Sequence, residues 1–147
     1  MGPHLNHSGP ASGVQAWIDG GAADEITLRE NTDAWQRIRL LPRVLRPLAD
    51  SHTRVTLLGR EWPAPLLVAP MAYQCAVHPH GEQATALAAA ALGAGLVLSC
   101  QASMPLAQVA RLHLGDAARG PLWFQLYLQA DRADTLALVE QAEAAGF

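Results

Sequence analysis

Three short apolar runs of the sequence end in residues whose hydrogen-bonding groups could hold a ligand. The runs cover residues 66–69, 96–98 and 122–127, and the groups are the main chain of Pro70, Met71 and Ala72 and the side chains of Ser99, Gln125 and Tyr127. If the runs are parallel strands of one barrel, their carboxyl ends converge on one mouth, where such groups could bind a polar molecule. Alternatively, Ser99 and Gln125 only end strands and Tyr127 is a core aromatic, since most buried polar groups merely satisfy a neighbour. Taken together, the residues favour a site.

The composition excludes several classes of protein. With 147 residues, of which 50% are hydrophobic and 16% charged, the chain can bury one sizeable core. Its net charge is −3 and its ten basic residues are scattered, so no basic surface for nucleic acid or an anionic membrane is expected. All ten are arginine, which excludes enzymes that form a lysine Schiff base and phosphate-binding loops that need a lysine.

The two cysteines, Cys75 and Cys100, are too few for a disulfide or zinc framework, and they favour a reduced, cytoplasmic setting. No apolar run reaches the roughly 18 residues of a membrane helix, and the first residues lack the pattern of a signal peptide. Residues 1–13 have almost nothing to bury and are predicted to be a flexible leader, ahead of a folded part over residues 14–147.

The spacing of apolar and helix-breaking residues predicts the elements that position the strand-end groups. A short helical turn through Trp17, a helix over residues 24–37 and a hairpin from residues 55–58 and 61–62 come first. Strands at 66–69, 96–98 and 122–127 then alternate with helices at 81–92, 105–112 and 132–145. Asp131 is expected to cap the last helix and Gly146 to end it, while His113 is expected to place a favourable charge at the end of the preceding helix.

This alternation predicts right-handed βαβ units on a parallel sheet, with strands that are apolar on both faces because both are covered. A doubly wound sheet would carry a glycine-rich turn after its first strand, but residues 69–73 contain no glycine. The predicted fold class is therefore α/β, a partial (β/α)8 TIM barrel whose first three βα units follow N-terminal helices and a small β-hairpin. A whole barrel would take about 250 residues.

Short motifs along the chain provide a second line of evidence. They are Gly21-Ala22-Ala23-Asp24-Glu25, Leu41-Pro42-Arg43-Val44-Leu45, Ala69-Pro70 with Ala72, His78-Pro79 with Gly81-Glu82, Leu98-Ser99 with Ala102-Ser103, and Trp123-Phe124-Gln125-Leu126-Tyr127 with Asp131-Arg132. In this order they resemble the FMN-dependent α-hydroxy acid oxidases and dehydrogenases, the family of glycolate oxidase, lactate oxidase and mandelate dehydrogenase. The resemblance runs from Trp17 to Phe147 without a long gap.

The resemblance implies that FMN is the cofactor, and it assigns roles to the strand-end residues. The main chain of Pro70, Met71 and Ala72 would lie along the flavin ring, near its reactive nitrogen. Ser99 and Gln125 would hold the polar edge of the ring. Donors in these places favour the negative charge that builds up on a flavin as it is reduced.

Two aromatic residues match positions that contact the substrate in the family. Tyr127 matches the tyrosine whose hydroxyl contacts the bound 2-hydroxy or 2-oxo acid. Trp17 aligns with an N-terminal tyrosine that contacts the substrate carboxylate, although packing against the hairpin accounts for Trp17 equally well. His78 and His80 fall in a motif of the family's first βα loop, so loop-closing hydrogen bonds are favoured there over a metal site.

The family oxidises an L-2-hydroxy acid to a 2-oxo acid with a histidine base, arginines for the substrate carboxylate and a lysine beside the flavin. The resemblance places these residues and the phosphate site on later strands, and the sequence ends at Phe147, about where a fourth strand would begin. We therefore predict no catalytic residue in this chain and no activity of the chain alone.

Two other functions remain open on the sequence. The chain could be a non-catalytic fragment or split-barrel subunit that needs a complementing chain, or it could belong to another flavin-binding barrel. The expected partners are a small 2-hydroxy acid and, for the full-length family, further copies of itself, with no nucleic acid and no membrane segment. An unpaired third strand would leave an apolar edge, and such edges recruit other chains.

Overall fold

The computed structural model describes residues 12–147, and the chain divides into two units, one up to Ser51 and one from His52 onwards. The amino-terminal unit holds the helices α1 (Ser12–Asp19) and α2 (Ile26–Arg37). The predicted leader at residues 1–13 lies almost entirely outside the described residues. The helix expected from Asp24 begins at Ile26 instead, because Glu25 adopts a left-handed backbone with a φ of 57°.

A small hairpin opens the second unit, as the sequence predicts. Strand β1 (Val55–Leu57) pairs antiparallel with β2 (Arg60–Trp62). The two turn residues, Leu58 and Gly59, have φ values of 50° and 74°. A tight two-residue turn between twisted strands needs positive φ at both positions, and glycine adopts it without strain.

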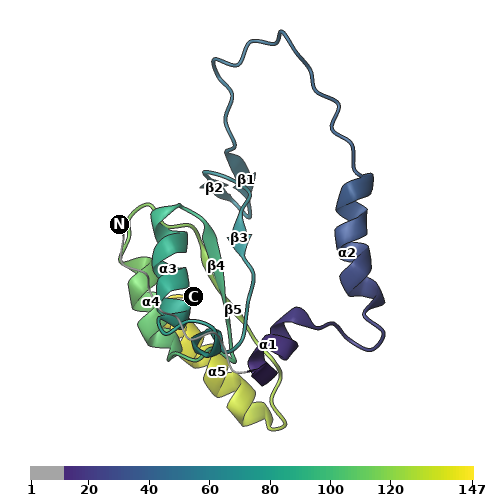
Figure 1. Cartoon of the computed structure of the whole chain (residues 1–147). Helices are drawn as coiled ribbons and strands as arrows, with labels where there is room; N and C mark the ends of the chain where they lie inside the picture. The colour runs from purple at the N-terminus through teal and green to yellow at the C-terminus, as the bar shows by residue number, and fades with distance from the viewer. Residues whose placement is uncertain (1–11) are drawn as a thin grey trace, which may run out of the picture. The chain divides into compact units, whose positions relative to one another are not determined.

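Three parallel strands form the sheet of the second unit, in the order β3, β4, β5. They are β3 (Leu67–Val68), β4 (Gly95–Ser99) and β5 (Leu122–Gln125). The 3-10 helix η1 (Gln74–Ala76) and helix α3 (Gly81–Ala91) connect β3 to β4, α4 (Leu106–Leu114) connects β4 to β5, and α5 (Arg132–Ala145) follows β5. Figure 1 shows α3 and α4 side by side along the sheet. The order of elements confirms the three predicted βα units.

The hydrophobic core of this unit lies between the sheet and its helices. Leu96 and Leu98 of β4 are each 2% exposed, and together with Leu122 of β5 they pack against small side chains of α3 and α4. The small residues, Ala86 and Ala89 in α3 and Val109 and Ala110 in α4, allow the helices to approach the strands closely.

The opposite face of the sheet carries the alternate residues of each strand. Since successive side chains point to opposite faces, Ser99 and Gln125 lie on the face away from the helices. Trp123 lies on the same face and packs edge-on against Trp62 of the hairpin, with 5.9 Å between the ring centroids. The predicted ligand-binding side chains therefore lie on the sheet face that the helices leave uncovered.

His113 lies in the last turn of α4, as predicted, but its ring is buried. This residue is fully buried, and its ring nitrogens lie 3.4 Å from the carbonyl oxygen of Ala86 and 3.1 Å from that of Gly120. Helix α4 continues to Leu114, so His113 falls on the side of the helix that packs against α3 and the approach to β5. Through these contacts it joins three chain segments.

The last helix ends as its sequence predicts. The Asp131 carboxylate accepts a hydrogen bond of 2.8 Å from the main-chain nitrogen of Ala133, which satisfies a free donor of the first turn. Gly146, with a φ of 93°, terminates the helix in the left-handed conformation that glycine favours.

Within residues 12–147, no helix combines the length and the apolar character needed to span a membrane.

Candidate functional site

Ser99 and Gln125 form a hydrogen-bonded pair at the carboxyl ends of two adjacent strands. They are register partners in the parallel ladder, and the Ser99 hydroxyl donates to Oε1 of Gln125 at 3.1 Å. The Ser99 oxygen in turn accepts from the main-chain nitrogen of Gln101, also at 3.1 Å. Within the described chain the amide nitrogen of Gln125 has no partner, so it can donate to a ligand.

The main chain after β3 lies beside this pair in the fold. Tyr73 donates its main-chain N–H to the carbonyl oxygen of Gln101 at 3.1 Å, which joins the loop after β3 to the loop after β4. Among residues 12–147, no hydrogen bond is made by the main-chain N–H groups of Met71 and Ala72. Two further donors are thus available at the end of β3, next to Pro70, which has no N–H.

Tyr127 lies two residues beyond β5, and its side chain is 56% exposed. This exposure contradicts the alternative that Tyr127 is a core aromatic. Its main chain is fixed from two directions, because its N–H donates to the sulfur of Cys100 at 3.4 Å and its carbonyl accepts from the Gln129 side chain at 2.7 Å. The backbone is held while the phenol stays accessible to a ligand.

Trp17 lies on α1, in the amino-terminal unit. The structure describes that unit separately from the strand ends, so it does not bring Trp17 together with Ser99, Gln125 and Tyr127. A contact between Trp17 and a substrate stays a prediction.

A residue without an assigned role in the sequence analysis, Glu82, connects the loops at this edge. Its carboxylate is 1% exposed, and Oε1 accepts from the main-chain nitrogens of Gln74 at 3.3 Å and Ser103 at 2.8 Å. The Ser103 hydroxyl accepts from the main-chain nitrogen of Cys75 at 3.1 Å. The sequence offers two signals for Glu82, its place in the family motif with His78 and an acidic residue in the first turn of a helix, and neither points to bonds with distant loops.

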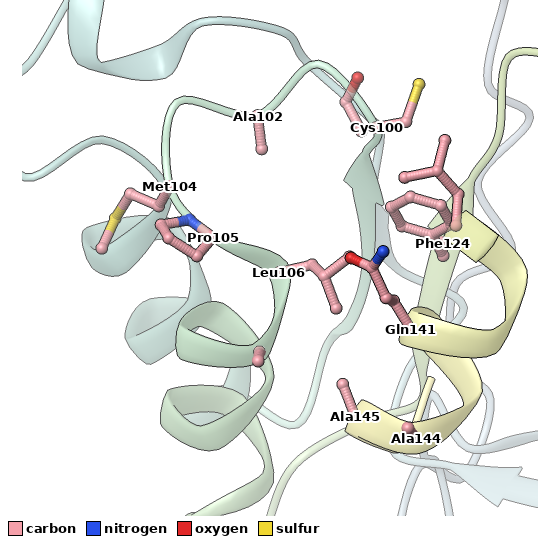
Figure 2. A pocket seen from close by; sticks show the side chains of 12 residues that line it. Cys100, Ala102, Met104, Pro105, Leu106, Phe124, Gln141, Ala144 and Ala145 are labelled. Carbon is pink, nitrogen blue, oxygen red and sulfur yellow. The ribbon is translucent and has the colours of Figure 1, made fainter. Parts of the chain in front are cut away.

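A mainly apolar cavity of about 490 Å³ lies between α4 and α5, on the helix-covered side of the sheet. Figure 2 shows it bounded by Pro105 and Leu106 on one side and by Gln141 and Ala145 on the other, with Phe124 beside it. Ser99 and Cys100 line this cavity, whereas Met71, Gln125 and Tyr127 do not. The cavity therefore adjoins the end of β4 without containing the other predicted site residues, and the hydrogen-bonding groups of the strand ends favour these as the candidate site.

The arrangement at the strand ends offers several hydrogen-bond donors to a polar ligand. Donors come from the main chain after β3 and from the Gln125 amide, and the Ser99 hydroxyl fixes the orientation of that amide. Such donors, held by a rigid sheet, stabilise negative charge that develops on a bound group.

The chain is similar to a known family and to several known proteins. The family model described as FMN-dependent dehydrogenase matches residues 10–147. An L-lactate oxidase from Roseobacter sp. (strain GAI101) is 50% identical over 127 residues, which are 86% of this chain and 33% of the relative. The human 2-hydroxyacid oxidase 2 is 40% identical over 131 residues, which are 89% of this chain and 36% of that protein.

Solved structures agree with the predicted fold. The crystal structure of a mandelate oxidase superposes on 93% of this chain and 38% of its own, with a TM-score of 0.82 and 36% sequence identity. This similarity confirms the predicted fold class, a partial (β/α)8 barrel. The chain spans about a third of the length of the curated relatives that it matches. On the match over residues 10–147, the chain belongs to the FMN-dependent dehydrogenase family.

Proposed function

We propose that this chain supplies part of the flavin and substrate site of an enzyme that oxidises an L-2-hydroxy acid to a 2-oxo acid with FMN. Residues 14–147 would be the amino-terminal part of the barrel. The observation that carries the proposal is the Ser99–Gln125 pair, at 3.1 Å on adjacent strand ends, beside the free main-chain donors of Met71 and Ala72.

The residues present fit one side of FMN. The edge of its ring system that carries the reactive nitrogen and the carbonyl groups consists mainly of hydrogen-bond acceptors. The free groups at the strand ends, the N–H of Met71, the N–H of Ala72 and the Gln125 amide nitrogen, are all donors within the described chain. When bound, FMN would supply the acceptor for the two electrons that the hydroxy acid loses.

The chain's own residues would hold the ring and stabilise charge. The Gln101 N–H donates to the Ser99 oxygen, which leaves the Ser99 proton for Gln125 and turns the amide nitrogen of Gln125 outwards. These donors are fixed before any ligand arrives, so they stabilise negative charge on the ring without reorganising. Tyr127, with an exposed phenol, would contact the carboxylate or the oxygen of the hydroxy acid.

The substrate class is proposed from the named relatives together with Tyr127. Lactate and mandelate differ in the group on the carbon that carries the hydroxyl, and they share the 2-hydroxy acid unit that a phenol can contact. The base for the hydroxyl proton, the arginines for the carboxylate and the lysine beside the flavin are assigned to the rest of the barrel, because this sequence contains no lysine and no other match to them.

The chain alone is therefore proposed to be inactive. Its unpaired Cys75 and Cys100 support a cytoplasmic setting.

The test is a titration with FMN followed by addition of L-lactate or L-mandelate. We expect the visible absorption of the flavin to bleach only when a second chain that carries the later strands of the barrel is also present. Bleaching by the isolated chain would contradict the assigned division of the site. Absence of bleaching in the complemented sample, with FMN bound, would refute the proposed substrate class.

A further inference from the structure

We propose that Glu82 is a positioning residue that holds the loops on either side of the flavin edge in register. The proposal rests on the proposed function for the identity of the ligand. It rests on the hydrogen bonds of Glu82 for the positioning itself. Glu82 is the most buried acidic side chain of the described chain, at 1% exposed, and it does not belong to the strand ends themselves.

One carboxylate oxygen receives an N–H from each of the two loops. Gln74, three residues after Met71, donates to Oε1 at 3.3 Å, and Ser103, four residues after Ser99, donates to the same oxygen at 2.8 Å. The Tyr73–Gln101 hydrogen bond of 3.1 Å lies between the same loops. The ends of β3 and β4 are thereby tied together immediately beyond the groups proposed to face the flavin.

A role as an ordinary helix cap does not account for these contacts. A capping side chain bonds to free amides of the first turn of its own helix. Glu82 instead accepts hydrogen bonds from one amide eight residues before it and from another twenty-one residues after it. Among residues 12–147, no arginine or histidine forms a salt bridge with this carboxylate. Its charge is compensated by main-chain N–H groups and by the positive end of α3, whose first turn contains it.

The neighbouring contacts make this arrangement specific. The side chain of Gln74 is oriented by Thr85, whose hydroxyl donates to its Oε1 at 2.6 Å, and the Ser103 hydroxyl accepts from Cys75 at 3.1 Å. At Gly81 a Cβ would lie 2.5 Å from the sulfur of Cys75, so the start of α3 approaches the first loop as closely as a glycine allows. The carboxylate therefore has one geometry available, and that geometry sets the spacing of the loops.

The experiment compares three variants of the full chain. Glu82→Met keeps the length of the side chain and removes both oxygens, whereas Glu82→Gln keeps one oxygen that can accept both N–H groups. Glu140→Met, on the exposed side of α5, is the matched control for replacing a glutamate by methionine. Amide hydrogen exchange at Gln74 and Ser103 reports on the loops without a ligand. Titration with FMN in the presence of the chain that carries the later strands, followed by flavin fluorescence and the visible spectrum, reports on the site.

We expect Glu82→Met to lose exchange protection at both amides, to raise the Kd for FMN about tenfold and to shift the flavin spectrum. Glu82→Gln should restore both properties to within about threefold of the wild-type values, and Glu140→Met should change neither. Unchanged protection in a folded Glu82→Met would overturn the inference. If Glu82→Met proves unfolded, the inference would be overturned by a Glu82→Gln variant that does not bind FMN with about the wild-type affinity. If protection is lost but the wild-type chain and all variants fail to bind FMN even with the complementing chain present, the proposed function fails while the joining of the loops by Glu82 stands.

Discussion

The hydroxyl of Ser99 makes two hydrogen bonds from a position that is only 4% exposed. Ser99→Ala removes the donor to Gln125 and leaves the Gln101 N–H without its acceptor. We expect the free energy of unfolding to fall by about 1–3 kcal/mol, as for other buried polar groups that lose their partner. Urea denaturation followed by tryptophan fluorescence measures this value.

Ser51→Ala is the control for this substitution. Ser51 is exposed, and within the described chain only its main-chain N–H is hydrogen-bonded, to the carbonyl of Leu48. Its replacement should change the free energy of unfolding by less than about 0.5 kcal/mol. Equal effects of the two substitutions would show that the Ser99–Gln125 pair contributes nothing particular to stability.

A second prediction for a single residue concerns the buried ring of His113. Both of its nitrogens face carbonyl oxygens, those of Ala86 and Gly120, and the residue is fully buried. His113→Leu fills most of the space but removes the contacts of the ring nitrogens with these carbonyls, so the free energy of unfolding should fall by about 2–4 kcal/mol. His52→Leu at an exposed position is the comparison. A loss of stability no larger than that of His52→Leu would mean that the two carbonyls do not need the ring.

Single residues show where sequence reasoning succeeds and where it stops. The adjacency of Ser99 and Gln125 could be predicted, because polar residues late in apolar runs fall near strand ends and parallel strands bring those ends together. His113 and Glu82 could not, because their partners are main-chain groups in distant segments. Nothing in the local sequence marks a carbonyl or an amide that only tertiary packing brings near.

Among the elements, α5 and β3 mark the two extremes of predictability. The predicted helix at 132–145 has the bounds that the structure gives α5, since Asp131 and Gly146 fix its ends through local bonds. The strand predicted at 66–69 is reduced to Leu67–Val68, because its length depends on how far β4 runs beside it. Helix η1 was not predicted, and it lies where the loop contacts of Glu82 begin.

The approach of the chain to β5 allows a prediction for a whole element. At Gly120 an added Cβ would lie 2.5 Å from main-chain atoms of Ala94 and 2.6 Å from the nitrogen of Gly95. Main-chain atoms of a strand cannot move aside, so Gly120→Ala should push β5 away from β4 and lower the free energy of unfolding by about 1–3 kcal/mol or more.

Thermal unfolding followed by circular dichroism measures the effect of Gly120→Ala. Gly13→Ala is the matched control, because nothing lies within 4 Å of a Cβ at that position. The control should leave the midpoint unchanged or raise it slightly, since alanine favours the helix in which Gly13 lies. A Gly120→Ala midpoint equal to the wild-type value would show that the two strands can separate at no cost.

At the scale of the whole molecule, the sheet exposes both apolar surface and unpaired strand edges. Among the described residues, β3 and β5 each pair with β4 alone. The face away from the helices shows Leu67 at 38% and Trp123 at 39% exposure. A parallel sheet is normally covered on both faces, and open edges of apolar strands recruit other chains. The fold therefore presents a surface suited to the remaining strands of a barrel or to another copy.

This surface leads us to expect that the chain, studied alone, associates as its concentration rises. Sedimentation velocity should show dimers or larger species whose fraction increases with concentration. Leu128→Lys adds a charge in the loop that follows β5, at a residue that is 82% exposed, and should weaken association without lowering stability. Leu92→Lys, 80% exposed at the end of α3, adds the same charge away from that edge and should leave association unchanged. A single monomeric species at every concentration would contradict the expectation, because it would mean that the open edge and the apolar face are protected within the chain itself.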